Sequence, residues 1–385
     1  MDIQRHARVD VADVLRGFAV MAIGILHSIE HFNFYSFADP PCEFMRFTDA
    51  AIWEGMFFAF GGKAYAIFAL LFGFSFFIQD DNQRLRGKDF RLRFCWRLVL
   101  LFLWGNLNAA FFTAEVLVLF SLVGFVLVFT CRLSEKVLLW LIGICMLQPV
   151  ALYFVVRAAT DSSFVLPAIP TGEYWNATFK MQMEGNFWQM VRVNLWEGQL
   201  ASLSWAWDNG RVFQTAGLFM LGMLAGRRNW FLREHLPLWG RILAGALIAF
   251  FPLYGLANML PRFIENPNLL TPLSMILSSL YKLAFMLVLV SGVLFAYYST
   301  RLQHLLQKLA PYGRMSLTNY ITQSIIGAML YYHWGFALHR YLCTTYCWLV
   351  GIAIFLLQLA FCTWWMKRHN HGPLEYLWKR ATWLK

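Results

Sequence analysis

The sequence contains few charged residues for its length. Of its 385 residues, 14% are Asp, Glu, Lys or Arg, whereas a soluble globular protein has about 25%. Hydrophobic residues make up 59% of the chain. A water-soluble protein of this size needs more polar surface than these residues provide, so we interpret residues 1–385 as a single integral membrane domain.

Several motifs of soluble enzymes are missing. The chain has no P-loop, no strand-associated GxGxxG, no GxSxG and no zinc-spaced set of Cys and His, so it shows no signature of a tightly bound cofactor. His369 and His371 stand in a tail without nearby carboxylates, and we predict no metal site. The seven cysteines form no CxxC pair; Cys343 and Cys347 can form a disulfide only if their loop faces an oxidising compartment.

Apolar runs long enough to cross a hydrocarbon core of about 30 Å occur at ten places. They cover roughly residues 12–29, 64–78, 95–112, 114–131, 137–156, 211–227, 238–260, 272–298, 315–333 and 346–366. The apolar stretch before the second run makes Gly61 and Gly62 either a break in one long helix or part of a re-entrant segment. The sequence therefore predicts an all-α, polytopic transmembrane helix bundle of about ten spans.

Positive charge is unevenly distributed among the loops between these runs. The formal net charge of +11 would fit nucleic acid, but it would equally fit Lys and Arg gathered on one membrane face. On alternate loops, 23 of the 32 Lys and Arg, including Arg5 and Arg8, fall on one side. This is the positive-inside pattern, which predicts that both termini are cytoplasmic. We expect a lipid bilayer, and no nucleic acid, as partner.

The longest non-cytoplasmic loop, 157–210, contains an amphipathic segment. In "NFWQMVRVNLWEGQL", Phe187, Val191 and Leu195 recur at helical spacing beside Trp188 and Trp196, which predicts a helix lying in the membrane interface. It would form either a packed cap or a lid over an outward-facing site.

Ionisable side chains near the outer end of the first run are candidates for catalysis, because polar groups at membrane depth are costly. His27 and His31 are four residues apart and share a helix face if the helix continues, with Glu30 beside them. An imidazole next to a carboxylate is suited to general-base chemistry. The alternative is that these side chains only contact headgroups or water.

A second group of polar residues should face the same compartment. Lys63 follows the Gly61–Gly62 break, and Asn108 and Glu115 flank the turn between the third and fourth runs. With His27 and Glu30 they form one predicted cluster, in which Glu115 has a catalytic role and Lys63 and Asn108 bind substrate. The alternative is a structural Lys63–Glu115 ion pair.

Three further sets of polar residues are candidates for binding. Lys282 lies deep within an apolar run, and Asn319 and Gln323 are four residues apart on the ninth run. All three side chains would line a substrate path, or they would only form contacts between helices. A dense basic segment would either mark the cytoplasmic side of the membrane or bind a phosphorylated donor. Its members are Arg84, Arg86, Arg91 and Arg93.

Four segments resemble the YeiB-like DUF418 membrane proteins of bacteria. They are "DVLRGFAVMAIGIL" at 13–26, "GGKAYAIFALLFGFSF" at 61–76, "GRMSLTNYITQSII" at 313–326 and "GPLEYLWKRATW" at 372–383. The matches run in order along essentially the whole chain. The sequence departs from the usual pattern at His27 (usually Asn), Asn108 (usually His) and Glu115 (usually Asp).

The first helices of that family look similar to those of membrane acyltransferases. The resemblance implies a multi-pass protein of the bacterial inner membrane in which His27 or His31 is the base, acyl-CoA is the co-substrate and a saccharide or lipid is the acceptor. Homodimerisation is compatible with this interpretation. Two other hypotheses stay open: a small-solute transporter or channel lined by Lys282, Gln148 and Asn258, and a non-catalytic lipid-binding protein.

Overall fold

The computed structural model describes residues 10–299 and 301–383, and all its regular elements are helical over these ranges. The first half of the bundle comprises α1 (Asp10–Ile29), α2 (Glu43–Phe60), α3 (Lys63–Arg84), α4 (Arg91–Ala109), α5 (Leu117–Val123), α6 (Phe125–Thr130), α7 (Glu135–Met146) and α8 (Pro149–Thr160). Arg5, Arg8 and Lys385, which contribute to the predicted charge bias, lie outside the described residues.

The second half begins with helices that follow one another closely: α9 (Thr171–Glu184), α10 (Phe187–Val193), a π-helical turn (Asn194–Gly198) and α11 (Gln199–Asp208). The remaining α-helices are α12 (Arg211–Arg227), α13 (Leu236–Met259), α14 (Pro267–Ser299), α15 (Gln303–Gln307), α16 (Leu309–Arg314), α17 (Ser316–Tyr331), α18 (Thr344–Met366) and α19 (Pro373–Thr382). Short 3-10 turns lie at Arg233–His235, Leu260–Arg262 and Leu338–Arg340.

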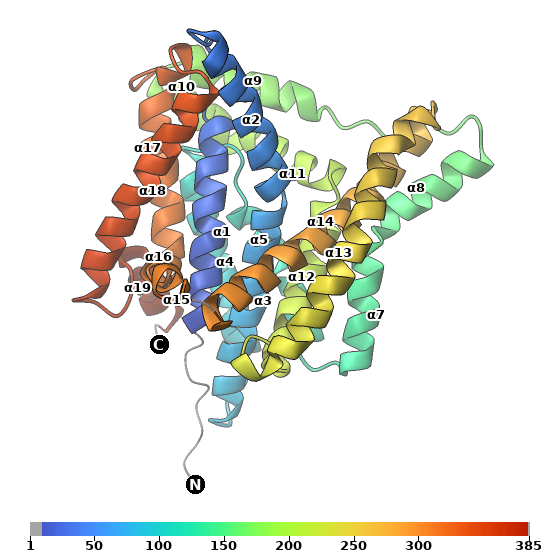
Figure 1. Cartoon of the computed structure of the whole chain (residues 1–385), viewed down its shortest axis with the longest axis vertical. Helices are drawn as coiled ribbons and strands as arrows, with labels where there is room; N and C mark the ends of the chain where they lie inside the picture. The colour runs from blue at the N-terminus through green and yellow to red at the C-terminus, as the bar shows by residue number, and fades with distance from the viewer. Residues whose placement is uncertain (1–9, 300, 384–385) are drawn as a thin grey trace.

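All ten predicted runs contain helix, but ten spans are not confirmed. Five helical segments of the described chain are long and apolar enough to cross a membrane, or six if α7 and α8, which meet at a bend of 51°, form one span. One of the five is Glu43–Arg84, so the structure has a single segment interrupted at Gly61 and Gly62. The described start of α1 and the tail helix α19 lie toward the same end of the bundle (Figure 1), whereas the membrane orientation stays a prediction.

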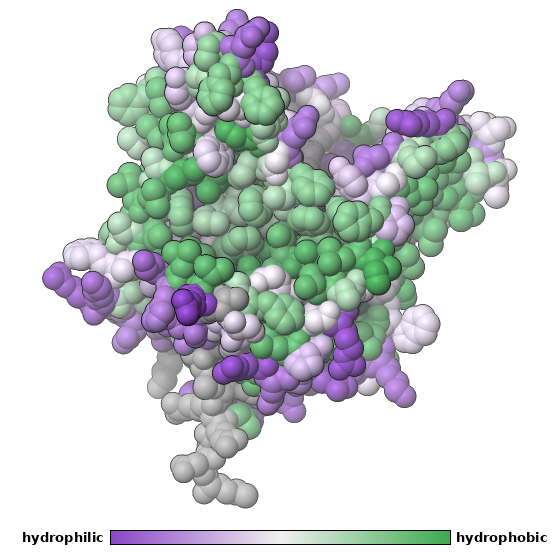
Figure 2. All heavy atoms as spheres, in the orientation of Figure 1, coloured by the Kyte–Doolittle hydropathy of each residue, from purple (hydrophilic) through white to green (hydrophobic). Residues whose placement is uncertain are grey.

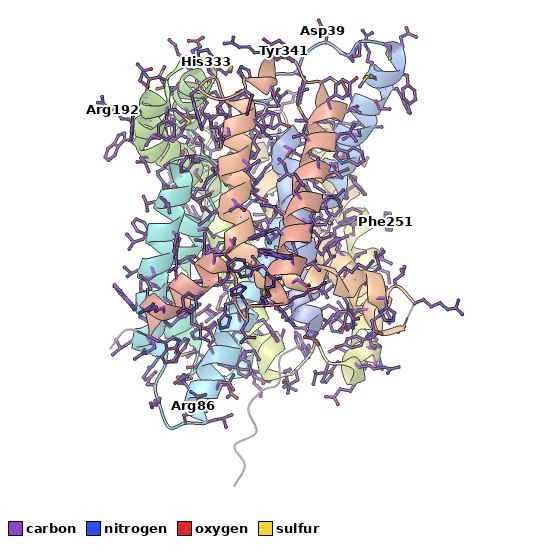
Figure 3. The ribbon with its side chains drawn as sticks, turned by 90° about the vertical axis from the view of Figure 1, so that its left-hand side faces the viewer. Asp39, Arg86, Arg192, Phe251, His333 and Tyr341 are labelled. Carbon is purple, nitrogen blue, oxygen red and sulfur yellow. The ribbon has the colours of Figure 1, made fainter. Side chains whose placement is uncertain are left out.

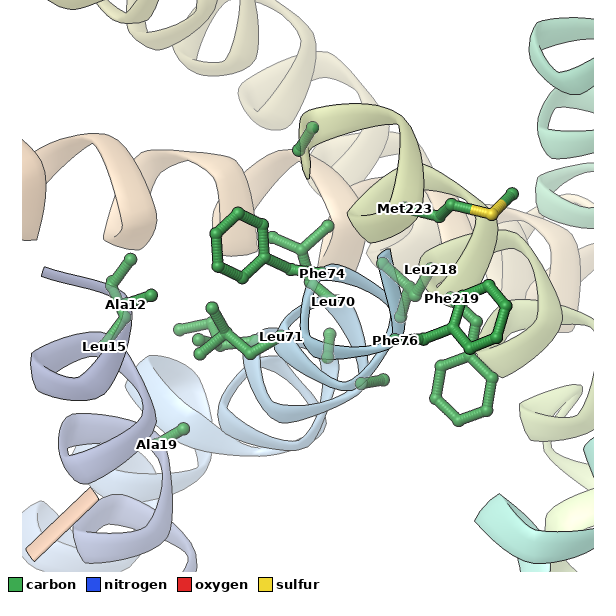
Figure 4. Close-up of a cluster of buried hydrophobic side chains, with 14 of the residues drawn as sticks. Ala12, Leu15, Ala19, Leu70, Leu71, Phe74, Phe76, Leu218, Phe219 and Met223 are labelled. Carbon is green, nitrogen blue, oxygen red and sulfur yellow. The ribbon is translucent and has the colours of Figure 1, made fainter. Parts of the chain in front are cut away.

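The core is built around α3, which lies between α1 and α12. Figure 4 shows Leu15 of α1, Leu71 and Phe74 of α3 and Phe219 of α12 in one apolar cluster. A Cβ at Gly73 of α3 would collide with the backbone of α12, so the two helices approach as closely as helices do when small residues line the contact. Within α1, Asp10 and Asp13 lie in the first turn, where the helix dipole favours negative charge.

The segment 157–210 forms several packed helices, and the predicted amphipathic stretch 186–200 lies within α10, the π-helical turn and the start of α11. The buried Gln182 of α9 donates a hydrogen bond to Asn194 (2.9 Å), and Asn194 donates one to the carbonyl of Ala110 (3.2 Å). These buried polar contacts join the segment to the end of α4. On the outside, Trp188 and Trp196 are 75% and 71% exposed, as expected for side chains at an interface.

Candidate functional site

A cavity of about 910 Å³ lies among α1, α2, α3, α11 and α14. Its ionisable lining residues are His27, Glu30, His31, Glu54, Lys63, Glu115, Arg211 and Lys282. On the face shown in Figure 2, the surface is recessed between α2 and the projecting ends of α8, α13 and α14. Large apolar walls with a few convergent polar groups are typical of ligand-binding cavities.

Glu30 is the centre of a polar cluster at the end of α1. Its Oε2 lies 3.3 Å from Nδ1 of His31, and its Oε1 accepts a hydrogen bond of 2.9 Å from the hydroxyl of Tyr35. The ring of His27 lies 5.6 Å from that of His31 and 4.6 Å from that of Phe112. The two histidines therefore lie side by side on the cavity wall, although α1 ends at Ile29.

The charge of Glu30 is fixed by its neighbours. Burial by itself raises the pKa of this carboxyl, but the interactions with His31, His27 and Tyr35 outweigh it and lower the pKa to about 2. Glu30 is therefore ionised near neutral pH and can orient the imidazole of His31 through its Nδ1 atom.

Glu115 lies on the same cavity but is held by different donors. Asn108, which is fully buried, donates a hydrogen bond to Oε2 of Glu115, and the backbone N–H of Leu117 donates to Oε1. The structure therefore brings Asn108 and Glu115 together as a pair. It shows no Lys63–Glu115 ion pair within the described residues.

Lys63 and Lys282 both line the cavity, and Arg211 joins them. Arg211 stands at the boundary between the 157–210 loop and the next apolar run, so the sequence pattern marks it only as a loop charge. Its side chain is 7% exposed and donates a hydrogen bond of 2.6 Å to Gln214. In the sequence, Arg211 could have been recognised by its position directly after the Asn209–Gly210 turn, where α12 begins.

The 157–210 segment covers part of this cavity. Trp175 from α9 and Trp205 from α11 belong to the lining, and the Trp175 ring lies 5.7 Å from that of His31. Ser202 donates a hydrogen bond of 3.0 Å to the backbone carbonyl of Glu115. The segment is thus both a packed cap and a wall of the site.

A second cavity, of about 230 Å³, lies on the far side of Tyr320, which lines both cavities. Arginines from three helices line it: Arg16 of α1, Arg97 of α4 and Arg314 of α16. Each of the four motifs that carry the family resemblance contributes at least one residue here. These are Arg16, Ser75, Arg314 and Glu375, among others.

Direct contacts hold these four motifs together. Arg16 donates hydrogen bonds to Asp13 (2.7 Å) and to Ser75 (2.8 Å), and Arg314 lies 3.4 Å from Asp13. Glu375 accepts hydrogen bonds from the backbone N–H (3.0 Å) and the hydroxyl (2.6 Å) of Thr318. The motifs are far apart in sequence but form one buried polar assembly at this cavity.

Asn319 and Gln323 line neither the 910 Å³ cavity nor the 230 Å³ cavity. Asn319 donates a hydrogen bond of 2.9 Å to the carbonyl of Tyr312 and accepts one from the thiol of Cys362. Gln323 lines a pocket of about 10 Å³ beside Gly24. The bonds of Asn319 agree with the alternative interpretation, hydrogen bonding between helices, whereas both amide atoms of Gln323 are buried without a hydrogen-bond partner among the described residues. Cys343 and Cys347 are free thiols in this structure.

The basic segment 84–93 lies at the end of the bundle opposite Asp39 and His333, where Figure 3 labels Arg86. Arg91 pairs with Asp89 at 2.6 Å, and Arg93 stacks 4.4 Å from the ring of Trp383. Neither the 910 Å³ cavity nor the 230 Å³ cavity is lined by Arg84, Arg86, Arg91 or Arg93.

The residues proposed for a transport path do not share a cavity. Lys282 lines the main cavity, whereas Gln148 lines a separate one of about 360 Å³ and donates hydrogen bonds to Gly210 and Ser279. Asn258 is bonded to the carbonyl of Tyr254 in its own helix. The structure therefore offers no specific support for a path along these side chains.

The fold and cavities define an all-helical protein with membrane-like spans, and comparisons with known proteins agree with that class. Residues 225–385 match the family model described as "Protein of unknown function (DUF418)". The chain is 25% identical to "Uncharacterized protein YxaH" of Bacillus subtilis, covering 98% of this chain and 95% of the relative. It is also 25% identical to "Uncharacterized 39.9 kDa protein in amylase 3'region" of Bacillus acidopullulyticus, covering 97% and 94%.

A third relative connects the chain with the family that its motifs resemble. "Uncharacterized protein YeiB" of Escherichia coli is 34% identical over 70 residues, which is 18% of each chain. These findings confirm the predicted resemblance to the YeiB-like DUF418 proteins, with the family model matching the C-terminal part of the chain. No solved structure matches the chain.

Proposed function

We propose that this protein is a membrane acyltransferase that moves an acyl group from a cytoplasmic thioester such as acyl-CoA to a hydroxyl or amine. The observation that carries this proposal is the cluster of His27, Glu30 and His31 on the wall of a 910 Å³ cavity. An imidazole titrates near neutral pH and is an efficient general base when a carboxylate orients it. The resemblance of the first helices to membrane acyltransferases points to the same chemistry.

The reaction needs one proton acceptor and one leaving group. His27 or His31 takes the proton from the acceptor hydroxyl or amine, whose oxygen or nitrogen then forms a bond to the thioester carbonyl carbon. The carbon–sulfur bond breaks, and the thiolate leaves and receives the proton from the imidazolium. Positive charge on the cavity wall stabilises the negative charge that develops on the carbonyl oxygen.

The second cavity is suited to the donor. Arg16, Arg97 and Arg314 present guanidinium groups, which match phosphate oxygens in charge and geometry. Because Tyr320 lines both cavities, an acyl arm extending from a donor at the arginines would pass this side chain to reach the histidines. This route assigns the donor to the four assembled motifs rather than to the exposed 84–93 segment.

The test uses purified protein in proteoliposomes supplied with radiolabelled acyl-CoA and an extract of lipids and saccharides as acceptors. We expect label to appear in an acceptor, and His27→Ala or His31→Ala to reduce the transfer on the order of 100-fold or more. His333→Ala is the matched control, because His333 lies on the outer surface beside Arg340. Transfer that is unchanged in both cavity variants would overturn the proposal.

A further inference from the structure

Three cationic side chains converge in the main cavity near Gly62. This residue has a positive φ of 73° and carries no side chain, and a Cβ placed there would lie 2.6 Å from Nη2 of Arg211 and 3.2 Å from Cδ of Lys282. Lys63 follows directly in the chain. The backbone break between α2 and α3 thus brings Lys63 of α3, Arg211 of α12 and Lys282 of α14 to one place.

The hydrogen bonds and ring contacts of these cations are to neutral groups. Lys63 donates to the carbonyls of Phe58 (2.7 Å) and Phe57 (3.2 Å), Arg211 donates to Gln214, and Lys282 lies 5.8 Å from the centre of the Tyr281 ring. Within residues 10–299 and 301–383, no carboxylate forms an ion pair with any of the three. Their charges instead repel one another.

The carboxylates that line the same cavity contact other groups or are exposed. Glu30 is paired with His31 and Tyr35, Glu115 accepts from Asn108 and the backbone, and Glu54 is exposed on α2. Like charges gathered at membrane depth are costly unless an anion compensates them. The cluster therefore has the charge pattern of an anion site whose ligand comes from outside the chain.

Aromatic side chains form an apolar wall next to the cations. The ring of Phe58 lies 5.2 Å from Phe285 and 5.8 Å from Tyr254, and the Nζ of Lys63 lies 5.4 Å from the Phe285 ring. Tyr254 and Tyr281 belong both to this wall and to the cavity lining. Phe251, on the same helix as Tyr254, is 68% exposed and points away from the bundle in Figure 3. A ligand at the cations can therefore extend an apolar chain along this wall toward the lipid.

We infer that Lys63, Arg211 and Lys282 bind the phosphomonoester or diphosphate head of a lipid whose chain follows the aromatic wall. Three converging cations match a head with at least two negative charges, whereas a carboxylate supplies one. The apolar wall favours a lipid over a free phosphate, because only a lipid has a hydrocarbon chain that can pack against these aromatic side chains. The idea that this lipid is the substrate rests on the proposed function. Binding of the lipid can be measured without any acyl transfer.

The experiment measures lipid binding to the purified full chain in phosphatidylcholine nanodiscs. Radiolabelled phosphatidic acid is the lipid probe, phosphatidylcholine the neutral competitor and pyrophosphate the free-anion probe. We expect saturable binding of phosphatidic acid and much weaker binding of pyrophosphate. Lys282→Met should weaken the binding of phosphatidic acid at least 10-fold, and Lys282→Arg should restore it, because the charge returns.

Controls separate the site from general attraction to anionic lipid. Lys136→Met removes an exposed cation of α7 far from this cavity's lining and should leave binding unchanged. Equal binding by Lys282→Met and the wild type, or displacement by phosphatidylcholine, overturns the inference; pyrophosphate binding as tight as that of phosphatidic acid overturns its lipid component. Binding without acyl transfer contradicts only the proposed function, whereas transfer without phosphatidic acid binding contradicts only this inference.

Discussion

Nδ1 of His31 lies 3.3 Å from Oε2 of Glu30 on the wall of the main cavity. This contact occurs just after α1, where the chain turns, and the hydroxyl of Tyr35 holds the other oxygen of the same carboxylate. A carboxylate bound to one ring nitrogen sets which nitrogen is free to accept a proton. In the proposed transferase, Glu30 therefore acts as a positioning residue for His31.

Replacing Glu30 tests that role. Glu30→Gln keeps the shape of the side chain but removes its charge, so we expect acyl transfer to fall about 10- to 100-fold while acceptor binding changes little. The measurement is the initial rate of label transfer in proteoliposomes.

The matched control is Glu54→Gln, since Glu54 lines the same cavity but is exposed. If Glu30→Gln leaves the rate unchanged while His31→Ala abolishes transfer, Glu30 does not position the base.

The donor route is tested by comparing two neighbouring arginines of α4. Arg97 lines the second cavity and lies 4.1 Å from the ring of Trp378, whereas Arg93 is outside the cavity and stacks on Trp383. Arg97→Gln should weaken acyl-CoA binding about 10-fold, because it removes a guanidinium–phosphate contact. Arg93→Gln should have little effect. Equilibrium binding of radiolabelled acyl-CoA measures both, and the reverse order would favour the donor site predicted at 84–93.

Asp13 links two of the assembled motifs. It is 5% exposed and pairs with Arg16 and Arg314. Asp13→Asn leaves Arg16 without its carboxylate and Arg314 with only its contact to Asp10, so we expect a loss of about 3 kcal/mol in the free energy of unfolding. Unfolding in mixed micelles measures the loss. Asp89→Asn, at an exposed pair with Arg91, should be close to neutral; equal effects of the two substitutions would contradict a structural role for Asp13.

Glu375 gives the protein a pH-dependent stability. Burial raises the pKa of this carboxyl above its ordinary value of 4.5, although hydrogen bonds from Thr318 oppose the shift. The folded protein then binds a proton more tightly than the unfolded chain, so the contribution of Glu375 to stability is present below pH 4.5 and is lost as the pH rises through the raised pKa. Relative to Glu375→Gln, the wild type should therefore become less stable across this range.

Melting temperatures of the two proteins from pH 4 upward measure this difference. Glu184→Gln, at an exposed residue of α9, serves as the control and should follow the wild type at each pH. A constant difference between wild type and Glu375→Gln at all pH values would show that the Glu375 carboxyl does not titrate differently in the folded state.

Part of the candidate site could be predicted because polar residues are rare in apolar runs. Six residues stood out for this reason, and the structure places all of them on one cavity: His27, Glu30, His31, Lys63, Glu115 and Lys282. Arg211 was missed because it begins an apolar run and so resembles an ordinary flanking charge. Asn319 and Gln323 stood out equally, but Asn319 bonds within the helix packing and Gln323 lines only a pocket of about 10 Å³. Sequence spacing does not tell which side of a helix meets a cavity.

The sequence by itself determined the class of the protein, since hydrophobicity and helical spacing act over neighbouring residues. It also determined where helices occur, and all ten predicted runs contain one. Only the tertiary structure decided which charges meet. The convergence of Lys63, Arg211 and Lys282 at Gly62 depends on how α3, α12 and α14 pack, and the assembly of four distant motifs around Arg16 depends on contacts between opposite ends of the chain. Packing of side chains across helices sets both, and no local pattern records it.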